Sequence, residues 1–167
     1  MREYFDSIKR RDPAARTIFQ IILLYPGVQA IFWYRIAHFL YQHHFKLLAE
    51  MMMFIVRCVL NIEIHPAATI GKRLFIDHGT GVVIGATSVI GDDVTMYHGV
   101  TLGGVGRGDS SGKRHPTVED GVTIGAGAKV LGNITLGQGC MIGANAVVLK
   151  DVPPRKTSVG VPSAVKK

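Results

Sequence analysis

The hydrophobic positions of this chain follow two different periods, and the change falls near residue 61. Upstream of it, apolar residues recur at spacings of three and four, which predicts amphipathic helices. Pro26-Gly27 separates one helix from the next. The two helical stripes are Val28, Ile31, Phe32, Ile36, Phe39 and Leu40, and then Leu47, Met51, Phe54, Ile55 and Val59. The pattern therefore predicts a helical segment over residues 1–61.

Downstream, apolar residues recur every six positions, a period that fits neither a helix nor an alternating strand. Many of them are followed directly by glycine. A six-residue period with glycines is typical of a parallel β-helix, in which the repeated side chains stack inside the coils. A glycine-rich sandwich would need regularly spaced hairpin turns, which the sequence lacks. We expect the β-helix to span residues 62–152, with a tail over 153–167. Its anchors are Ile64, Ile70 and Ile76; Ile84, Ile90, Met96 and Leu102; and Val118, Ile124, Val130, Leu136, Ile142 and Val148.

The six-residue count fails at two places. Ile76 and Ile84 are eight residues apart, so two extra residues lie between Asp77 and Gly81. A longer insertion, the loop 103–117, separates Leu102 from the next anchor. Insertions in repeat proteins form loops, often on the binding face. Because both breaks carry ionisable side chains, they are the predicted functional positions; these side chains are Asp77 and His78, and Arg114 and His115.

Residue chemistry suggests roles for three side chains near these breaks. His78 suits a general base near neutral pH, and the alternative is an exposed histidine with no role. Glu63 precedes the first anchor by one residue, where it would meet the imidazole one coil away and orient it, or else be a solvated carboxylate. Arg114 suits bidentate binding of a carboxylate, and the alternative is a solvated loop arginine.

Composition narrows the classes of partner. The 167 residues fit one domain, and the net charge of +7 suits nucleic acid, a membrane surface or an anionic small molecule. The basic residues are scattered without an aromatic stripe, so we expect no nucleic acid. The chain has neither a recognisable signal peptide nor an apolar run long enough to span a membrane. Cys58 and Cys140 predict no disulfide and suit buried positions in a cytoplasmic protein. The histidine spacings match no zinc pattern, so no metal is expected.

The motifs of this chain resemble those of serine O-acetyltransferases in the hexapeptide acyltransferase superfamily. The resemblance covers nearly the whole chain and combines an Asp-His-Gly-Thr-Gly segment with an Arg-His-Pro segment. It rests on Arg11-Asp12-Pro13-Ala14, Glu63-Ile64-His65-Pro66, Ile76-Asp77-His78-Gly79-Thr80-Gly81, Val100-Thr101-Leu102-Gly103-Gly104, Lys113-Arg114-His115-Pro116, Ile124-Gly125-Ala126-Gly127-Ala128-Lys129 and Gly160-Val161-Pro162.

The resemblance implies a left-handed β-helix that forms a homotrimer, with active sites between subunits. It implies acetyl transfer from acetyl-CoA to L-serine, which gives O-acetylserine for cysteine biosynthesis. His78 would be the general base and Glu63 its acidic partner. The residues that would bind the amino acid are Asp12, Asp77, Arg114 and His115. Those that would line the CoA groove are Gly103, Gly104, Ala126, Lys129 and Ala144.

Two departures and three alternatives accompany this interpretation. Longer family members have a larger N-terminal helical domain that joins two trimers, so a hexamer is in doubt here. Their longer C-terminal tail docks into the sulfhydrylase that follows, and this chain, which ends Val165-Lys166-Lys167, is not expected to dock that way. The alternatives are another hexapeptide acetyltransferase acting on a sugar or a different amino acid, a metal-dependent hydratase of the carbonic anhydrase kind, and a non-catalytic scaffold.

Overall fold

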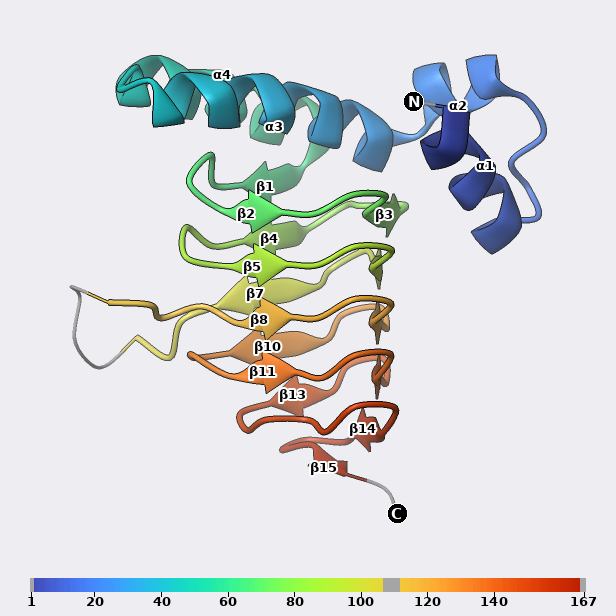
Figure 1. Cartoon of the computed structure of the whole chain (residues 1–167), viewed down its shortest axis with the longest axis vertical. Helices are drawn as coiled ribbons and strands as arrows, with labels where there is room; N and C mark the ends of the chain where they lie inside the picture. The colour runs from blue at the N-terminus through green and yellow to red at the C-terminus, as the bar shows by residue number, and fades with distance from the viewer. Residues whose placement is uncertain (1, 107–111, 166–167) are drawn as a thin grey trace.

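A computed structural model of the chain describes residues 2–106 and 112–165, which form four helices and fifteen short strands. Figure 1 shows the helices gathered at one end of a β-helix, with the C-terminus at the other end. The helices are α1 (Arg2–Arg11), α2 (Ile18–Leu24), α3 (Pro26–Gln42) and α4 (Lys46–Leu60). The strands are β1 (Ile62–Ile64), β2 (Thr69–Ile70), β3 (Phe75–Asp77), β4 (Val82–Ile84), β5 (Val89–Ile90), β6 (Thr95–Tyr97), β7 (Thr101–Gly103), β8 (Thr117–Val118), β9 (Thr123–Ile124), β10 (Lys129–Leu131), β11 (Thr135–Leu136), β12 (Met141–Ile142), β13 (Val147–Val148), β14 (Thr157–Val159) and β15 (Ala164–Val165).

Three sheets form the sides of the β-helix. The five-stranded sheet has the order β1-β4-β7-β10-β13, the four-stranded sheet β11-β8-β5-β2, and the six-stranded sheet β15-β14-β12-β9-β6-β3. Neighbouring strands are parallel except for β14 and β15, which pair antiparallel. The anchors stack in register, with Ile64 on Ile84 and Ile84 on Leu102, and their side chains are buried. The predicted parallel β-helix behind a helical segment is therefore confirmed, and parallel pairing continues past residue 152 into β14.

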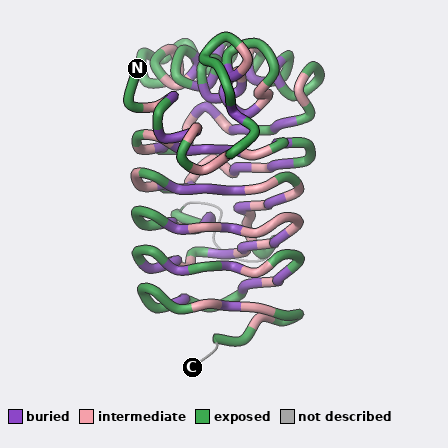
Figure 2. The backbone as a smooth tube through the Cα atoms, turned by 90° about the vertical axis from the view of Figure 1, so that its right-hand side faces the viewer, coloured by how far each residue is buried: buried purple, intermediate pink, exposed green. Residues whose placement is uncertain are grey.

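The helices occupy the predicted segment, but they turn a different face inward. The residues that α3 and α4 bury are Gly27, Val28, Ala30, Ile31, Tyr34, Ala37, Ala49, Met53 and Val56. Of the predicted apolar stripes, Val28 and Ile31 are buried and Leu40 is half-buried. The other stripe residues are exposed, and Figure 2 shows much of the helical end as exposed. These helices are apolar on most sides, and the small side chains let the backbones pack closely. Periodicity therefore located the helices without identifying the buried side.

Two smaller expectations have mixed outcomes. Both cysteines are free, and Cys140 is buried as expected. The expectation that Cys58 is buried is wrong, because α4 turns it toward its exposed face. None of the helices within residues 2–106 and 112–165 is both long and apolar enough to cross a membrane.

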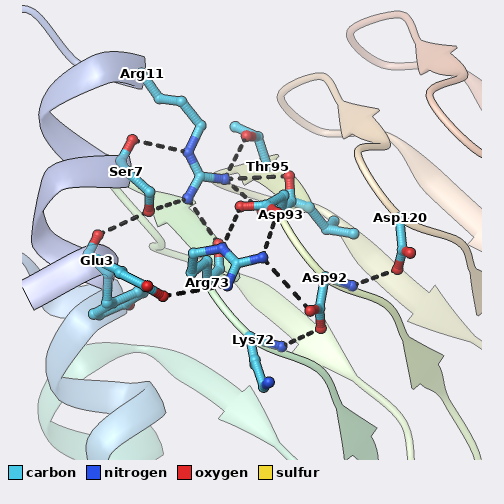
Figure 3. Close-up of polar contacts among 11 residues, drawn as sticks. Glu3, Ser7, Arg11, Lys72, Arg73, Asp92, Asp93, Thr95 and Asp120 are labelled. Carbon is cyan, nitrogen blue, oxygen red and sulfur yellow. Dashed lines mark hydrogen bonds and ion pairs between the residues drawn. The ribbon is translucent and has the colours of Figure 1, made fainter. Parts of the chain in front are cut away.

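Arg11, at the end of the first helix, makes several hydrogen bonds to the β-helix (Figure 3). From the end of α1, the Arg11 guanidinium donates hydrogen bonds to the carbonyl oxygens of Arg73 at 2.7 Å and Val94 at 3.0 Å, and to Thr95 Oγ1 at 3.1 Å. Arg73 in turn forms a salt bridge with Asp93 at 2.7 Å. These contacts join α1 to the first two coils, and so they determine where the residue after the helix, Asp12, lies.

Candidate functional site

The two extra residues of the first break are His78 and Gly79. Asp77 pairs with Tyr97 of the next coil, and the Gly99 amide donates to the Thr80 carbonyl at 2.8 Å, so nothing in that coil matches residues 78 and 79. The Gly79 amide donates to the Asp77 carbonyl at 2.7 Å and closes a γ-turn around His78. His78 has a φ of +59° there, a conformation that costs on the order of 1–3 kcal/mol in a residue other than glycine. Its imidazole is exposed, with 74% of the side chain accessible.

Beside this turn lies a pocket of about 350 Å³ that contains two carboxylates, Asp12 and Asp77. Asp12 Oδ1 accepts a hydrogen bond from the Ala14 amide at 2.8 Å, and Oδ2 accepts one from the Tyr25 hydroxyl at 2.5 Å. Asp77 Oδ2 is 4.0 Å from His78 Nε2. Among the described residues that line the pocket, none is lysine or arginine. A pocket with two carboxylates and no basic side chain suits a cationic group such as an ammonium.

The second predicted group, Arg114 and His115, is held in place by Thr87. The Thr87 hydroxyl oxygen accepts hydrogen bonds from the amides of Arg114 at 3.0 Å and His115 at 3.1 Å. His115 Nδ1 accepts from the Thr87 amide at 3.1 Å and lies 2.8 Å from its hydroxyl, so Nδ1 carries no proton. The His115 ring is buried over Gly85, where it fills the space that a Cβ would occupy.

The surroundings of His115 keep its imidazole neutral. Burial, followed by the positive charge of Arg114 and smaller contributions from His65 and Lys113, lowers the pKa of His115. A neutral ring with Nδ1 as acceptor has its proton on Nε2, which makes Nε2 a hydrogen-bond donor. The Arg114 side chain is exposed beside it, while its backbone is fixed by Thr87.

Glu63 does not meet His78 within one chain. It lies on the outer face of β1, where it forms a salt bridge with Arg57 at 3.2 Å between Oε2 and Nη1. Among the residues that the structure describes, no hydrogen bond or ion pair joins Glu63 to His78. Instead, Glu63 shares a shallow pocket with His65, at the other end of β1 from the turn that contains His78.

The predicted substrate-binding residues therefore fall into two groups on opposite edges of the five-stranded sheet. Strand β4 begins just after the His78 turn and ends just before Gly85, which the His115 ring covers. The three strand residues Val82–Ile84 separate the two edges by about 10 Å, at ~3.3 Å per residue. Figure 1 shows the same separation, with β3 on one side and the loop between β7 and β8 extending from the other. We refer to these two predicted groups, which lie apart within one chain, as half-sites.

The residues predicted to line a CoA groove show the same division. Ala126 and Ala144 follow β9 and β12 in register, directly below His98, at the edge that carries His78. Gly103 and Gly104 lie at the opposite edge, where Gly104 is next to the backbone of Arg114. Lys129 lies between the two edges on β10, and its ammonium donates to the Gly99 carbonyl. Small side chains at both edges leave room for a long ligand on this face.

Residues 107–111 of the predicted loop 103–117 lie outside the described residues. Within residues 2–106 and 112–165, no group of three or more His, Cys, Asp and Glu side chains is arranged to hold a metal ion.

Comparisons with known proteins point to one family. The family described as bacterial transferase hexapeptide (six repeats) matches residues 115–150. A serine acetyltransferase of Mycobacterium tuberculosis is 55% identical over 165 residues, which are 99% of this chain and 71% of that protein. The chain belongs to the serine acetyltransferase family.

Solved serine acetyltransferases share the fold. The Brucella abortus enzyme in complex with coenzyme A has a TM-score of 0.94 and 45% identity, and the match covers 98% of this chain and 65% of that one. The soybean enzyme in complex with serine has a TM-score of 0.93 and 46% identity, covering 97% of this chain and 66% of that one. This chain therefore spans about two thirds of the length of these solved serine acetyltransferases.

Three residues of the site were not identified from the sequence. Tyr25 lies in the helical segment, where no break in a period marks it. Thr87 occupies an ordinary position within a hexad, and only the structure shows its hydroxyl bonded to the loop exit. Gly85 follows the anchor Ile84 as glycines follow other anchors, and only the structure shows that its missing side chain makes room for His115. In this serine acetyltransferase family member, Thr87 and Gly85 support the loop exit that a break revealed, and Tyr25 supports Asp12, which the family resemblance indicated.

Proposed function

We propose that this chain transfers the acetyl group of acetyl-CoA to the hydroxyl of L-serine, giving O-acetylserine for cysteine biosynthesis. The observation that carries the proposal is the pocket in which Asp12 and Asp77 lie beside the exposed imidazole of His78. Two carboxylates suit the ammonium of an amino acid, and the histidine suits its hydroxyl. The family membership and the relatives solved with serine and with coenzyme A support both substrates.

In the proposed reaction, the substrate ammonium binds between Asp12 and Asp77, which brings the serine hydroxyl to His78. His78 accepts the hydroxyl proton while the serine oxygen forms a bond to the acetyl carbon. The bond from that carbon to sulfur then breaks, and the proton held by His78 goes to the departing thiolate. Acetyl-CoA supplies the acetyl group as an activated thioester. Arg114 would bind the serine carboxylate, with His115 donating from Nε2.

We further propose that two neighbouring subunits of a homotrimer complete each site. The support is the division of the half-sites between opposite edges of the five-stranded sheet, which a head-to-tail cyclic contact would bring together. Glu63 of the neighbouring subunit would then reach His78 as its acidic partner. A trimer is the smallest closed ring that head-to-tail contacts form, since a two-fold dimer uses the same surface on both subunits. The proposal leaves the hexamer open.

The proposal includes a cytoplasmic location. Its support is that Cys58 and Cys140 are both free thiols, which suits a reducing compartment. Family membership disfavours a hydratase or an inert scaffold. A different amino-acid acceptor is the remaining alternative, because the paired carboxylates favour an ammonium-bearing acceptor over a neutral sugar.

The test is release of free CoA thiol from acetyl-CoA in the presence of L-serine, L-homoserine, L-threonine or a neutral sugar. We expect release that depends on L-serine, with a higher kcat/KM for L-serine than for the other acceptors. Thiol release that is indifferent to L-serine would reject the proposal. A preference for another amino acid would keep the reaction class and change the substrate.

A further inference from the structure

The Asp12 carboxylate has a fixed orientation because both of its oxygens are already bonded. The Ala14 amide binds Oδ1 at 2.8 Å, and the Tyr25 hydroxyl binds Oδ2 at 2.5 Å. A carboxylate has about four acceptor positions, so each oxygen keeps one free for a ligand. The amide belongs to the same turn as Asp12, whereas Tyr25 comes from the junction of α2 and α3. Tyr25 is therefore the side chain that fixes this carboxylate from outside its own segment.

Tyr25 is itself held in place by contacts with the β-helix. Its ring stacks on the Phe75 ring, with centroids 6.4 Å apart and an interplanar angle of 29°. Two residues later, Gly27 presses against the Ile76 carbonyl so closely that a Cβ would overlap it. Phe75 and Ile76 belong to β3, the strand that ends at Asp77. The geometry of β3 thus determines the position of the Tyr25 hydroxyl as well as that of Asp77.

The Tyr25 hydroxyl keeps its proton throughout the range in which the protein functions. Partial burial, the hydrogen bond to Asp12, and the charges of Asp12 and Asp77 raise the pKa of Tyr25 to about 12. A neutral phenol donates one hydrogen bond, and Asp12 uses it. The phenol therefore adds no charge of its own to the pocket, and it leaves the two carboxylates to bind a cation.

We propose that Tyr25 is a positioning residue for the acceptor: its hydroxyl holds the Asp12 carboxylate in the orientation in which it binds the ammonium of the amino acid. This inference rests on the proposed function. Tyr25 acts through Asp12 and takes no part in proton transfer or acetyl transfer. Its loss therefore weakens binding of the amino acid without changing binding of acetyl-CoA.

The test compares Tyr25→Phe with wild type by steady-state kinetics. Phenylalanine keeps the stacking on Phe75 and removes only the hydroxyl. We expect KM for L-serine to rise roughly 10- to 100-fold, as for a lost hydrogen bond to a charged group, with kcat within about twofold and KM for acetyl-CoA unchanged. The matched control is Tyr4→Phe, which removes a buried hydroxyl that makes no hydrogen bond within the described part of the chain. This control should behave as wild type.

A double-mutant cycle with Asp12→Asn separates positioning from a direct role. If Tyr25 acts through Asp12, adding Tyr25→Phe to Asp12→Asn changes KM for L-serine no further. An unchanged KM in Tyr25→Phe, a fall in kcat alone, or an equal loss in both backgrounds would overturn the inference. A wild-type protein that fails to acetylate L-serine would instead reject the proposed function, so the two failures are distinguishable.

Discussion

At the scale of single residues, backbone strain and the proposed general base coincide at position 78. The γ-turn pushes the imidazole out of the stack of coils and into solvent, and a φ of +59° is the cost. Gly79 permits the turn, because its φ is +82° and a Cβ there would overlap Ile62. The surrounding coils hold a conformation that histidine alone would avoid, as strained residues at functional sites often require.

Substituting His78 should separate activity from stability. His78→Ala should lower turnover by ~10²–10⁴, as for a lost general base. His78→Gly should lose as much activity, but its free energy of unfolding should be about 1 kcal/mol higher than that of wild type, because glycine adopts a positive φ without strain. Turnover assays and urea unfolding measure the two effects. His43→Ala, at an exposed histidine beyond α3, is the control for turnover and should leave it unchanged. Normal turnover in His78→Ala would contradict the proposed mechanism.

The sequence identified some of the candidate site residues and not others. His78, Arg114 and His115 were identified because they lie where the six-residue count fails. Tyr25 and Thr87 interrupt no pattern, and their importance comes from hydrogen bonds to residues distant in sequence. The expected contact between Glu63 and His78 assumed that residues one coil apart share an edge. Glu63 instead lies within β1 and pairs with Arg57, whereas His78 lies in the turn before β4.

At the scale of elements, α1 is a short helix that depends on the β-helix for its position. Arg11 makes this connection with hydrogen bonds to backbone carbonyls of both of the first two coils. A planar guanidinium reaches several acceptors at once, which an ammonium cannot do. Sequence periodicity predicted a helical segment, but nothing in it indicated which arginine would join that segment to the coils.

Replacing Arg11 with lysine should therefore loosen α1. We expect Arg11→Lys to lower the free energy of unfolding by about 2 kcal/mol, since at least two charged hydrogen bonds are lost. KM for L-serine should rise as well, because Asp12 directly follows the helix. Urea unfolding and steady-state kinetics measure these changes. Arg10→Lys, at the exposed neighbouring arginine, is the matched control. Equal behaviour of the two variants would contradict the role assigned to Arg11.

At the scale of the whole molecule, the outer face of the five-stranded sheet separates two half-sites. The sequence predicted the coils because their anchors repeat, and it predicted both half-sites because each interrupts the repeat. Their separation across β4 depends on how the chain turns at each corner. The pattern of residues does not predict that geometry. The same limit applies to the exposed apolar side chains of α3 and α4, because periodicity does not indicate which face of a helix packs against the rest of the protein.

Co-expression of two inactive chains should restore activity if sites form between subunits. We expect neither His78→Ala nor Arg114→Ala alone to turn over substrate well. In mixed trimers, about a quarter of the sites combine an intact His78 from one subunit with an intact Arg114 from its neighbour. Activity should therefore recover to about a quarter of the wild-type value. A chain that carries both substitutions, co-expressed with His78→Ala, is the control. Absence of recovery in the mixed trimers would place the whole site within one subunit.

Stability should fall in mild acid because of buried imidazoles. Burial is the main cause that lowers the pKa of both His65 and His115 below the ordinary value of 6.5. Below about pH 6.5 the unfolded chain therefore binds more protons than the folded chain. The contribution of the two neutral imidazoles to the free energy of unfolding is fully present above about pH 6.5, and it is lost as the pH falls toward their folded-state pKa values. Thermal unfolding between about pH 8 and about pH 5 measures this slope. His115→Asn, which keeps an acceptor for Thr87, should flatten it, and an unaltered slope would contradict this assignment.

The two-residue turn at His78 is an addition to the regular repeat, so it could be removed without changing the hexads on either side. Deleting residues 78 and 79 would restore a count of six between Ile76 and Ile84, and the loop 103–117 would then be the remaining break in the repeat. Every coil below has a corresponding corner, about 4.8 Å further along the axis. A two-residue insertion at any of those corners would project a new side chain from the same edge of the β-helix. The corners are therefore equivalent positions for such an insertion, and this protein has one at residues 78 and 79.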